Sequence, residues 1–117
     1  MNISIQKSVN RKPLSVDFDL HTDGDLEFKA ELVILMIENM RELQESWSKA
    51  NKQNNLEIFR ESCHKVKPTI SILDDKELID AIEQLKHQTD ENEKKNTIAM
   101  FNRLCEDLIK GLEEEIK

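Results

Sequence analysis

Hydrophobic residues recur at every third or fourth position through most of the chain after residue 25, which is the spacing of amphipathic helices. This pattern predicts a first helix over about residues 26–52. Its expected core-facing residues are Leu32, Leu35, Met36, Asn39, Met40, Leu43 and Trp47. A polar cluster at residues 51–55 ends this helix, and Asn54 or Asn55 can cap the next one.

Three further helices are predicted, joined by short connections. The second covers about residues 56–73, and its apolar stripe consists of Leu56, Phe59, Cys63, Val66, Ile70 and Leu73. Asp74 or Asp75 caps a shorter third helix, whose apolar residues are Leu78, Ile79, Ile82 and Leu85. Residues 88–95 form a charged, solvated connection. The fourth helix carries Ile98, Phe101, Leu104, Cys105, Leu108, Leu112 and Ile116.

Residues 1–24 follow a different pattern, in which apolar and polar residues alternate. The apolar members are Ile3, Ile5, Val16, Phe18 and Leu20, with Pro13 between the two groups. This alternation predicts an extended or partly ordered arm and not a helix. Residues 23–25 have turn chemistry, and Asp25 can cap the first helix. The expected fold is therefore all-α: an N-terminal arm over 1–24, then an up-down-up-down antiparallel four-helix bundle over 25–117.

Composition and charge narrow the possible functions. The 117 residues include only two glycines and two prolines, which favours helix, and the net charge is −7. A negative field repels nucleic acid and anionic membranes, so neither is expected as a partner. The longest apolar run, Leu32 to Ile37, is too short to span a membrane. No basic segment leads into an apolar stretch at the N-terminus, so we expect no signal peptide and a cytoplasmic protein. The starting methionine and the single expected domain favour a free-standing protein.

The candidate chemistry lies in the second helix, around His64. If Phe59, Cys63 and Val66 face the core, His64 lies at or near the surface. Arg60 lies one turn before His64 and Lys67 one turn after it, so two permanent cations flank an imidazole nucleophile. Neutral imidazole can attack a phosphoryl group, and a lysine can stabilise the charge on its oxygens. The alternative is that His64 is an ordinary polar surface residue, as we expect for His21 and His87.

The segment from Cys63 to Lys67 resembles the signature of histidine phosphotransfer domains. In that family a small residue precedes the histidine, an apolar residue follows two positions later, and a lysine follows three positions later. The resemblance extends over roughly residues 24–115. It includes the entry to the first helix, with Gly24-Asp25 followed by Phe28, Glu31 and Leu32, and the passage into the third helix, with Ser71-Ile72-Leu73 followed by Glu77-Leu78 and Leu85.

This resemblance implies a phosphorelay intermediate of a two-component system, not an enzyme with its own kinase site. His64 would accept a phosphoryl group from a receiver-domain aspartate and pass it to another receiver. Lys67, and more weakly Arg60, would stabilise the phosphate. The receiver, in a response regulator or a hybrid histidine kinase, would supply the catalytic residues and a divalent metal. The chain would need no cofactor, and we expect it to be a monomer.

Pro68 departs from the family pattern, because many members have glycine at this position. Proline removes a backbone donor and disfavours helical geometry at Lys67. Either the helix kinks or ends here, with Pro68 opening a new turn, or the bend exposes the imidazole and orients Lys67; the two interpretations are compatible.

A docking surface for the partner is expected beside His64. Pairing of the first two helices around residue 53 places His64 beside Glu42 or Leu43. The expected docking residues are Val33, Ile37 and Met40 on the first helix, with Lys65, Pro68 and Ser71 on the second. Alternatively, the apolar residues Val33, Ile34 and Ile37 pack against the 1–24 arm.

Two other functions are compatible with the sequence to different degrees. The chain could be a phosphorylation-independent adaptor that binds a receiver or another partner through the first helix. A metal site at Cys63 and His64 is disfavoured, because adjacent helical residues point in different directions and a third ligand is missing. Cys63 and Cys105 are therefore interpreted as small apolar core residues and not as a disulfide.

Overall fold

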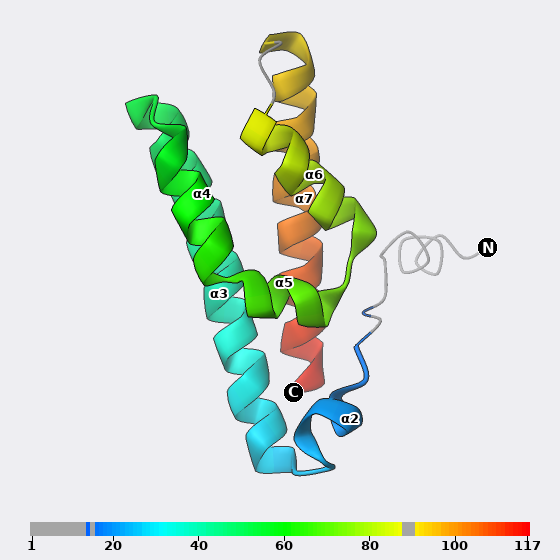
Figure 1. Ribbon diagram of the computed structural model, residues 1–117. Coiled ribbons are helices and arrows are strands. Elements are labelled where there is room, and N and C mark those ends of the chain that lie inside the picture. The colour runs from blue at the N-terminus through cyan, green and yellow to red at the C-terminus, as the bar shows by residue number, and fades with distance from the viewer. Residues whose placement is uncertain (1–13, 15, 88–90) are drawn as a thin grey trace, which may run out of the picture.

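Six helices make up the ordered secondary structure in the computed structural model, which describes residue 14 and the ranges 16–87 and 91–117. They are α2 (Phe18–Thr22), α3 (Leu26–Gln53), α4 (Leu56–Lys65), α5 (Lys67–Leu73), α6 (Lys76–His87) and α7 (Glu91–Glu115) (Figure 1). No strand occurs in these ranges, so the prediction of an all-α protein is confirmed. None of these helices combines the length and the hydrophobicity that crossing a bilayer requires.

Polar side chains define where the helices begin. The Asp25 carboxylate accepts a hydrogen bond from the Phe28 N–H at 3.0 Å, and the Asp75 carboxylate accepts one from the Leu78 N–H at 2.9 Å. Asn55 caps α4 in the same way by accepting from the Glu57 N–H at 3.2 Å. These bonds satisfy N–H groups that have no partner within the first turn of a helix. Three of the caps expected from the sequence are thereby confirmed.

The long helix α3 is the element on which most of the others pack. It lies along α4 on one side and α7 on the other, and α6 packs on α7. Figure 1 shows α3 and α4 as one leaning pair, α6 and α7 as a second pair, and α5 crossing between them. At the centre, Phe59 meets Trp47 edge-on at 5.2 Å and Phe101 at 5.9 Å between ring centroids. This aromatic cluster joins α3, α4 and α7 into one helical bundle.

The N-terminal segment contains a helix where the sequence predicted none. Asp17 caps α2, and within this short helix Phe18 and Thr22 are buried while Leu20 is 78% exposed. The expectation of a non-helical arm is therefore wrong for Phe18–Thr22, because burial follows an i, i+4 spacing instead of alternation. Leu14 packs against Gly111 of α7, and a Cβ at Gly111 would lie 3.1 Å from its Cγ. Residues 1–13 and 15 lie outside the described residues.

The connection predicted over residues 88–95 is shorter than expected. Helix α7 begins at Glu91, so the prediction of a connection is wrong for residues 91–95, although these helical residues are mostly exposed to solvent as expected. Glu and Lys are good helix formers, and Glu91 and Glu93 in the first turn interact favourably with the helix dipole. Residues 88–90 lie outside the described residues.

The central position of Phe59 predicts that its truncation destabilises the protein strongly. Replacing Phe59 with Ala removes a fully buried ring and both aromatic contacts, so we expect the free energy of unfolding to fall by about 3–5 kcal/mol. The same truncation at Phe28, which is 47% exposed, should cost less than about 1 kcal/mol. Urea unfolding followed by circular dichroism measures both, and equal losses would contradict the assigned core.

Candidate functional site

The second predicted helix is interrupted at Val66. Helix α4 ends at Lys65, Val66 has φ −94° and ψ 10°, and α5 begins at Lys67. The single helix expected over residues 56–73 is therefore two helices. Pro68 lies in the first turn of α5, where a missing N–H breaks no hydrogen bond of that helix. The interpretation in which the helix ends here and Pro68 opens a new turn is confirmed.

Two polar contacts fix α4 and α5 on α3. The Lys65 ammonium pairs with the Glu42 carboxylate at 3.2 Å, so the residue after His64, and not His64 itself, contacts the predicted position on α3. The Asn39 side-chain amide donates to the buried Thr69 hydroxyl at 2.6 Å. The first contact lies immediately before the helix break and the second immediately after it. The bend around Val66 therefore has a contact with α3 on each side, of which the part-buried Asn39–Thr69 hydrogen bond is the better shielded.

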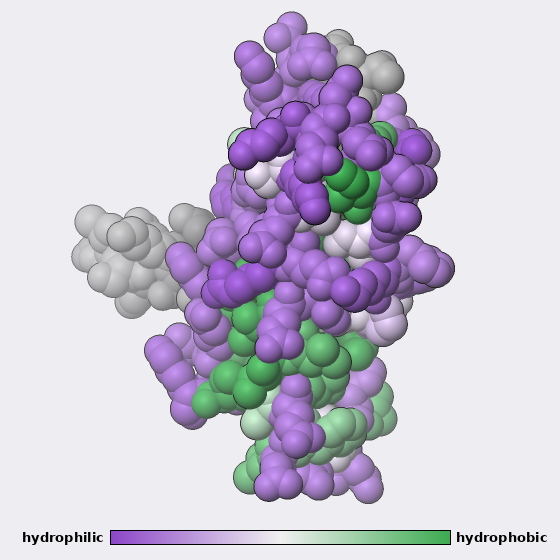
Figure 2. All heavy atoms as spheres, turned by 90° about the vertical axis from the view of Figure 1, so that its left-hand side faces the viewer, coloured by the Kyte–Doolittle hydropathy of each residue, from purple (hydrophilic) through white to green (hydrophobic). Residues whose placement is uncertain are grey.

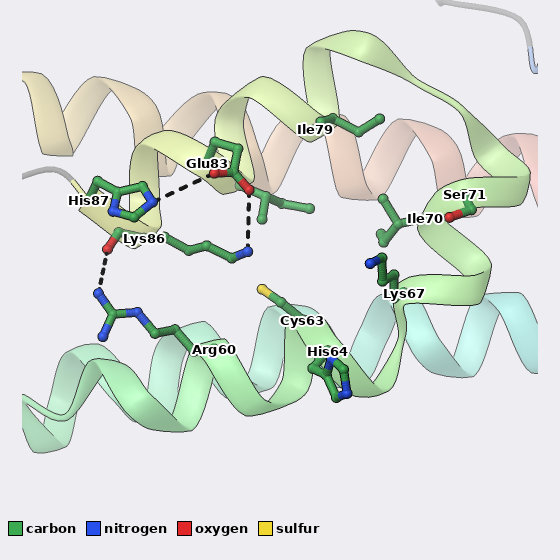
Figure 3. Close-up of a pocket in the computed structure, with 11 residues that line it drawn as sticks. Arg60, Cys63, His64, Lys67, Ile70, Ser71, Ile79, Glu83, Lys86 and His87 are labelled. Carbon is green, nitrogen blue, oxygen red and sulfur yellow. Dashed lines mark hydrogen bonds and ion pairs between the residues drawn. The ribbon is translucent and has the colours of Figure 1, made fainter.

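A groove of about 610 Å³ opens where α4 and α5 face α6. From α4 and α5 it is lined by Arg60, Cys63, His64, Lys67, Ile70 and Ser71. His64 and Lys67 are both exposed, as the sequence predicted for His64. Figure 3 shows them close to the helix break, with Ser71 further along α5. His64, Lys67 and Arg60 thus line the same groove, but the Arg60 guanidinium lies at the opposite end from Lys67 (Figure 3).

Helix α6 contributes a charged cluster to the opposite wall. Glu83 pairs with the Lys86 ammonium at 3.3 Å and with His87 Nε2 at 3.6 Å. Arg60 donates from its guanidinium to the Lys86 carbonyl oxygen at 3.0 Å. These contacts lie at the far end of the groove from Lys67 and Ser71 (Figure 3). Arg60 therefore bridges α4 to the end of α6, a contact that the sequence did not predict.

Sequence reasoning missed Glu83 and Lys86 as groove residues. The available signal was helical spacing, because Ile79, Ile82, Glu83 and Lys86 share the i, i+3, i+4, i+7 face of α6. Their position opposite His64 depends on how α6 packs, which no local pattern encodes. His87 is exposed, as expected, but it also lines this groove.

The two cysteines are free and buried, as predicted. Burial raises the pKa of the Cys63 thiol to about 11; Lys86 opposes this effect and Glu83 adds to it. Burial, with a smaller contribution from Glu106, also raises the pKa of Cys105. Because only the thiolate is a strong nucleophile, Cys63 is unreactive at neutral pH although it lines the groove.

Several of the predicted docking residues are not at the surface. Val33 and Met40 are 0% exposed, so the prediction that their side chains dock a partner is wrong. Both belong to the stripe of α3 that faces the core, which runs through Val33, Met36, Met40, Leu43 and Trp47. Ile37 is partly buried against this core, whereas Lys65, Pro68 and Ser71 are exposed.

Two exposed apolar residues of α3 lie between the buried positions Val33 and Met36 in the sequence, and Leu26 and Phe28 at the start of the helix are exposed as well. Ile34 is 47% exposed and Leu35 is 51% exposed, although Leu35 was expected to face the core. Figure 2 shows apolar side chains gathered in the lower half of this face, where Figure 1 places the first half of α3. Helix α4 ends opposite Glu42 and does not extend over this half. Residues of the N-terminal segment, chiefly Phe18, pack into the core there, which supports the alternative that the arm covers part of α3.

Comparison of the chain with protein-family models, with characterised proteins and with solved structures finds no match in any of the three.

The position of Pro68 predicts a small effect of its substitution. Pro68→Ala should change the free energy of unfolding by no more than about 1 kcal/mol, since the proline in the first turn of α5 acts mainly by restricting the unfolded chain. A proline inside a continuous helix would instead cost ~3 kcal/mol, and its removal would stabilise the protein by that amount. Urea unfolding of the wild type and the variant distinguishes the two cases.

Proposed function

We propose that the chain is a cytoplasmic phosphorelay intermediate that accepts a phosphoryl group on His64. The observation that carries the proposal is that an exposed imidazole and the exposed Lys67 line one groove, on the two sides of the break at Val66. No carboxylate partner is recorded for either side chain in the described part of the chain. Both side chains are exposed, so an incoming phosphoryl group can reach them. The likeness of residues 63–67 to the histidine phosphotransfer signature supports the same conclusion.

The chemistry of such a site is a reversible displacement at phosphorus. The unprotonated imidazole nitrogen of His64 attacks the phosphoryl group of a receiver aspartyl phosphate, an N–P bond forms, and the P–O bond breaks to release the aspartate carboxylate. Lys67 stabilises the charge on the phosphoryl oxygens, which is roughly −2 on the phosphorylated protein. The reverse displacement passes the group to a second receiver, so this chain needs no kinase site of its own.

Electrostatics favour His64 over the second histidine of the groove. His87 Nε2 lies 3.6 Å from the Glu83 carboxylate, which repels an approaching phosphoryl group. His64 instead has Lys67 beside it in the groove lining. The two histidines therefore serve as a matched pair: both are exposed and line one groove, but only His87 has a carboxylate next to its imidazole.

The proposed partner surface combines the groove with the exposed apolar half of α3. Ile34 and Leu35 supply apolar area, and Lys65, Pro68 and Ser71 supply an exposed rim. The partners would be receiver domains of response regulators or hybrid histidine kinases.

An up-down-up-down antiparallel order of α3, α4, α6 and α7 is the arrangement that the proposed class of protein requires.

The acceptor is tested by chemical phosphorylation with phosphoramidate. Wild-type protein and His87→Gln should each gain one acid-labile phosphoryl group by intact-protein mass spectrometry, with release of ammonia. His64→Gln should gain none, because its side chain has no nucleophilic nitrogen. The phosphorylated wild type, mixed with a panel of receiver domains and Mg²⁺, should lose its phosphoryl group to a receiver aspartate. Equal labelling of His64→Gln and wild type would refute His64 as the acceptor.

The docking surface is tested by Leu35→Glu, which places a carboxylate in the exposed apolar half of α3. We expect binding to a receiver to weaken on the order of tenfold or more, because burying an unpaired charge costs more than about 1.4 kcal/mol. Leu20→Glu is the control variant, since Leu20 is also a highly exposed leucine (78%) but lies on α2 and not on α3. Isothermal titration calorimetry with the receiver found above measures both.

Receiver binding of the Leu35→Glu variant, compared with signalling by the His64→Gln variant, separates the adaptor function from the relay. An adaptor would bind the receiver through Leu35 and would signal normally with His64→Gln. Loss of signalling in His64→Gln together with retained receiver binding supports the relay. Equal binding of Leu35→Glu and Leu20→Glu would exclude this half of α3 as the docking surface.

A further inference from the structure

The groove between α4 and α6 differs in charge from the rest of the protein. The chain has a net charge of −7, yet the groove lining contains Arg60, Lys67 and Lys86 against Glu83 as its single carboxylate. Glu83 is shared between Lys86 and His87. Because Glu83 pairs only with these two residues of the groove lining, its negative charge does not compensate the positive charges of Arg60 and Lys67. A positive site on an acidic protein favours an anionic ligand.

Both uncompensated cations have donors available. The Arg60 guanidinium has five N–H donors, and the contact recorded for it is one hydrogen bond to the neutral Lys86 carbonyl oxygen. This bond fixes the guanidinium at the end of α6 without neutralising it. Lys67 is exposed at the other end of the groove, and no ion pair is recorded for it among the described residues.

Between the two ends the groove is apolar. Ile82 is 6% exposed and Cys63 is 9% exposed, and the partly buried Ile70 and Ile79 complete the apolar part of the lining. The Cys63 thiol is uncharged at neutral pH, since burial raises its pKa to about 11. A volume of about 610 Å³ lies within the range of small-molecule sites, roughly 300–1,000 Å³. An apolar lining with cations at its ends matches a molecule that has an apolar body and an anionic head.

We propose that this groove is a binding site for a small organic anion with an apolar body, whose head group is held by Arg60 or Lys67. The body lies against Ile79 and Ile82. Binding itself does not depend on the function proposed above. One consequence rests on that function: because His64 and Lys67 belong to the same lining, a bound anion blocks phosphorylation of His64.

Hexyl phosphate, used below its micelle concentration, is the probe. Protein labelled at its isoleucine methyl groups is titrated by NMR, and we expect saturable shifts of the Ile79 and Ile82 signals. Hexanol lacks the charge and inorganic phosphate lacks the apolar body, so each should bind on the order of tenfold more weakly or worse. Hexanol binding as tightly as hexyl phosphate would overturn the anionic part of the proposal, and unshifted Ile79 and Ile82 signals would overturn the site.

Charge-removing variants locate the head group. Arg60→Gln or Lys67→Gln should weaken hexyl phosphate binding on the order of tenfold, the size of one charge-assisted contact. Lys65→Gln is the matched control, because Lys65 is on the same helix as Arg60 but pairs with Glu42 outside the groove. Equal weakening by Lys65→Gln would show that only net charge matters and would refute the site.

The relation to phosphorylation is measured separately. Hexyl phosphate should slow labelling of His64 by phosphoramidate, whereas hexanol should not. If His64 is never labelled but hexyl phosphate still shifts Ile79 and Ile82, the relay function fails and the binding site stands. If His64 is labelled and hexyl phosphate does not bind, the relay stands and this inference fails.

Discussion

The break in the helix at Val66 is the constraint on which the site depends. A proline at position 68 has no N–H to donate to the His64 carbonyl, so a helix that starts at Leu56 does not continue unchanged through it. The chain instead ends α4, bends at the buried Val66 and starts α5 with Pro68 in its first turn. Helix α5 then crosses towards α6 instead of continuing along α3 (Figure 1). The groove beside His64 and the exposure of Ile34 and Leu35 on α3 both follow from that change of direction.

Two contacts with α3 make the bend a defined structure. The Lys65–Glu42 ion pair is exposed and contributes little stability, but it marks the register of α3 and α4. The Asn39–Thr69 hydrogen bond is more shielded, and its loss would leave the buried Thr69 hydroxyl without this partner. On the other wall of the groove, Arg60 holds the end of α6 through a backbone carbonyl. Polar contacts thus position the three elements of the groove, while the aromatic cluster around Phe59 holds the bundle together.

The errors of the sequence analysis have a common physical origin. Alternation of Val16, Phe18 and Leu20 suggested extended chain, but so short a segment fits a helical turn equally well, and burial of Phe18 decides between them. On α3, the apolar residues extend around much of the helix, so periodicity could not fix which of them face inward. Which apolar residues of α3 are buried depends on where α4 and α7 end, because a side chain is buried only where a neighbouring helix lies over it. Val33 is therefore buried and Leu35 is exposed.

The sequence by itself determined the four amphipathic helical segments and the caps at Asp25, Asn55 and Asp75, though not α2, because caps and periodicity are local properties. It also determined that His64 is exposed on α4 and that proline perturbs the helix after it. Only the tertiary structure decided that α6 places Glu83, Lys86 and His87 opposite His64 in one groove. It likewise decided which apolar face of α3 remains uncovered. Those features depend on contacts between segments far apart in the chain, which no pattern within a single helix specifies.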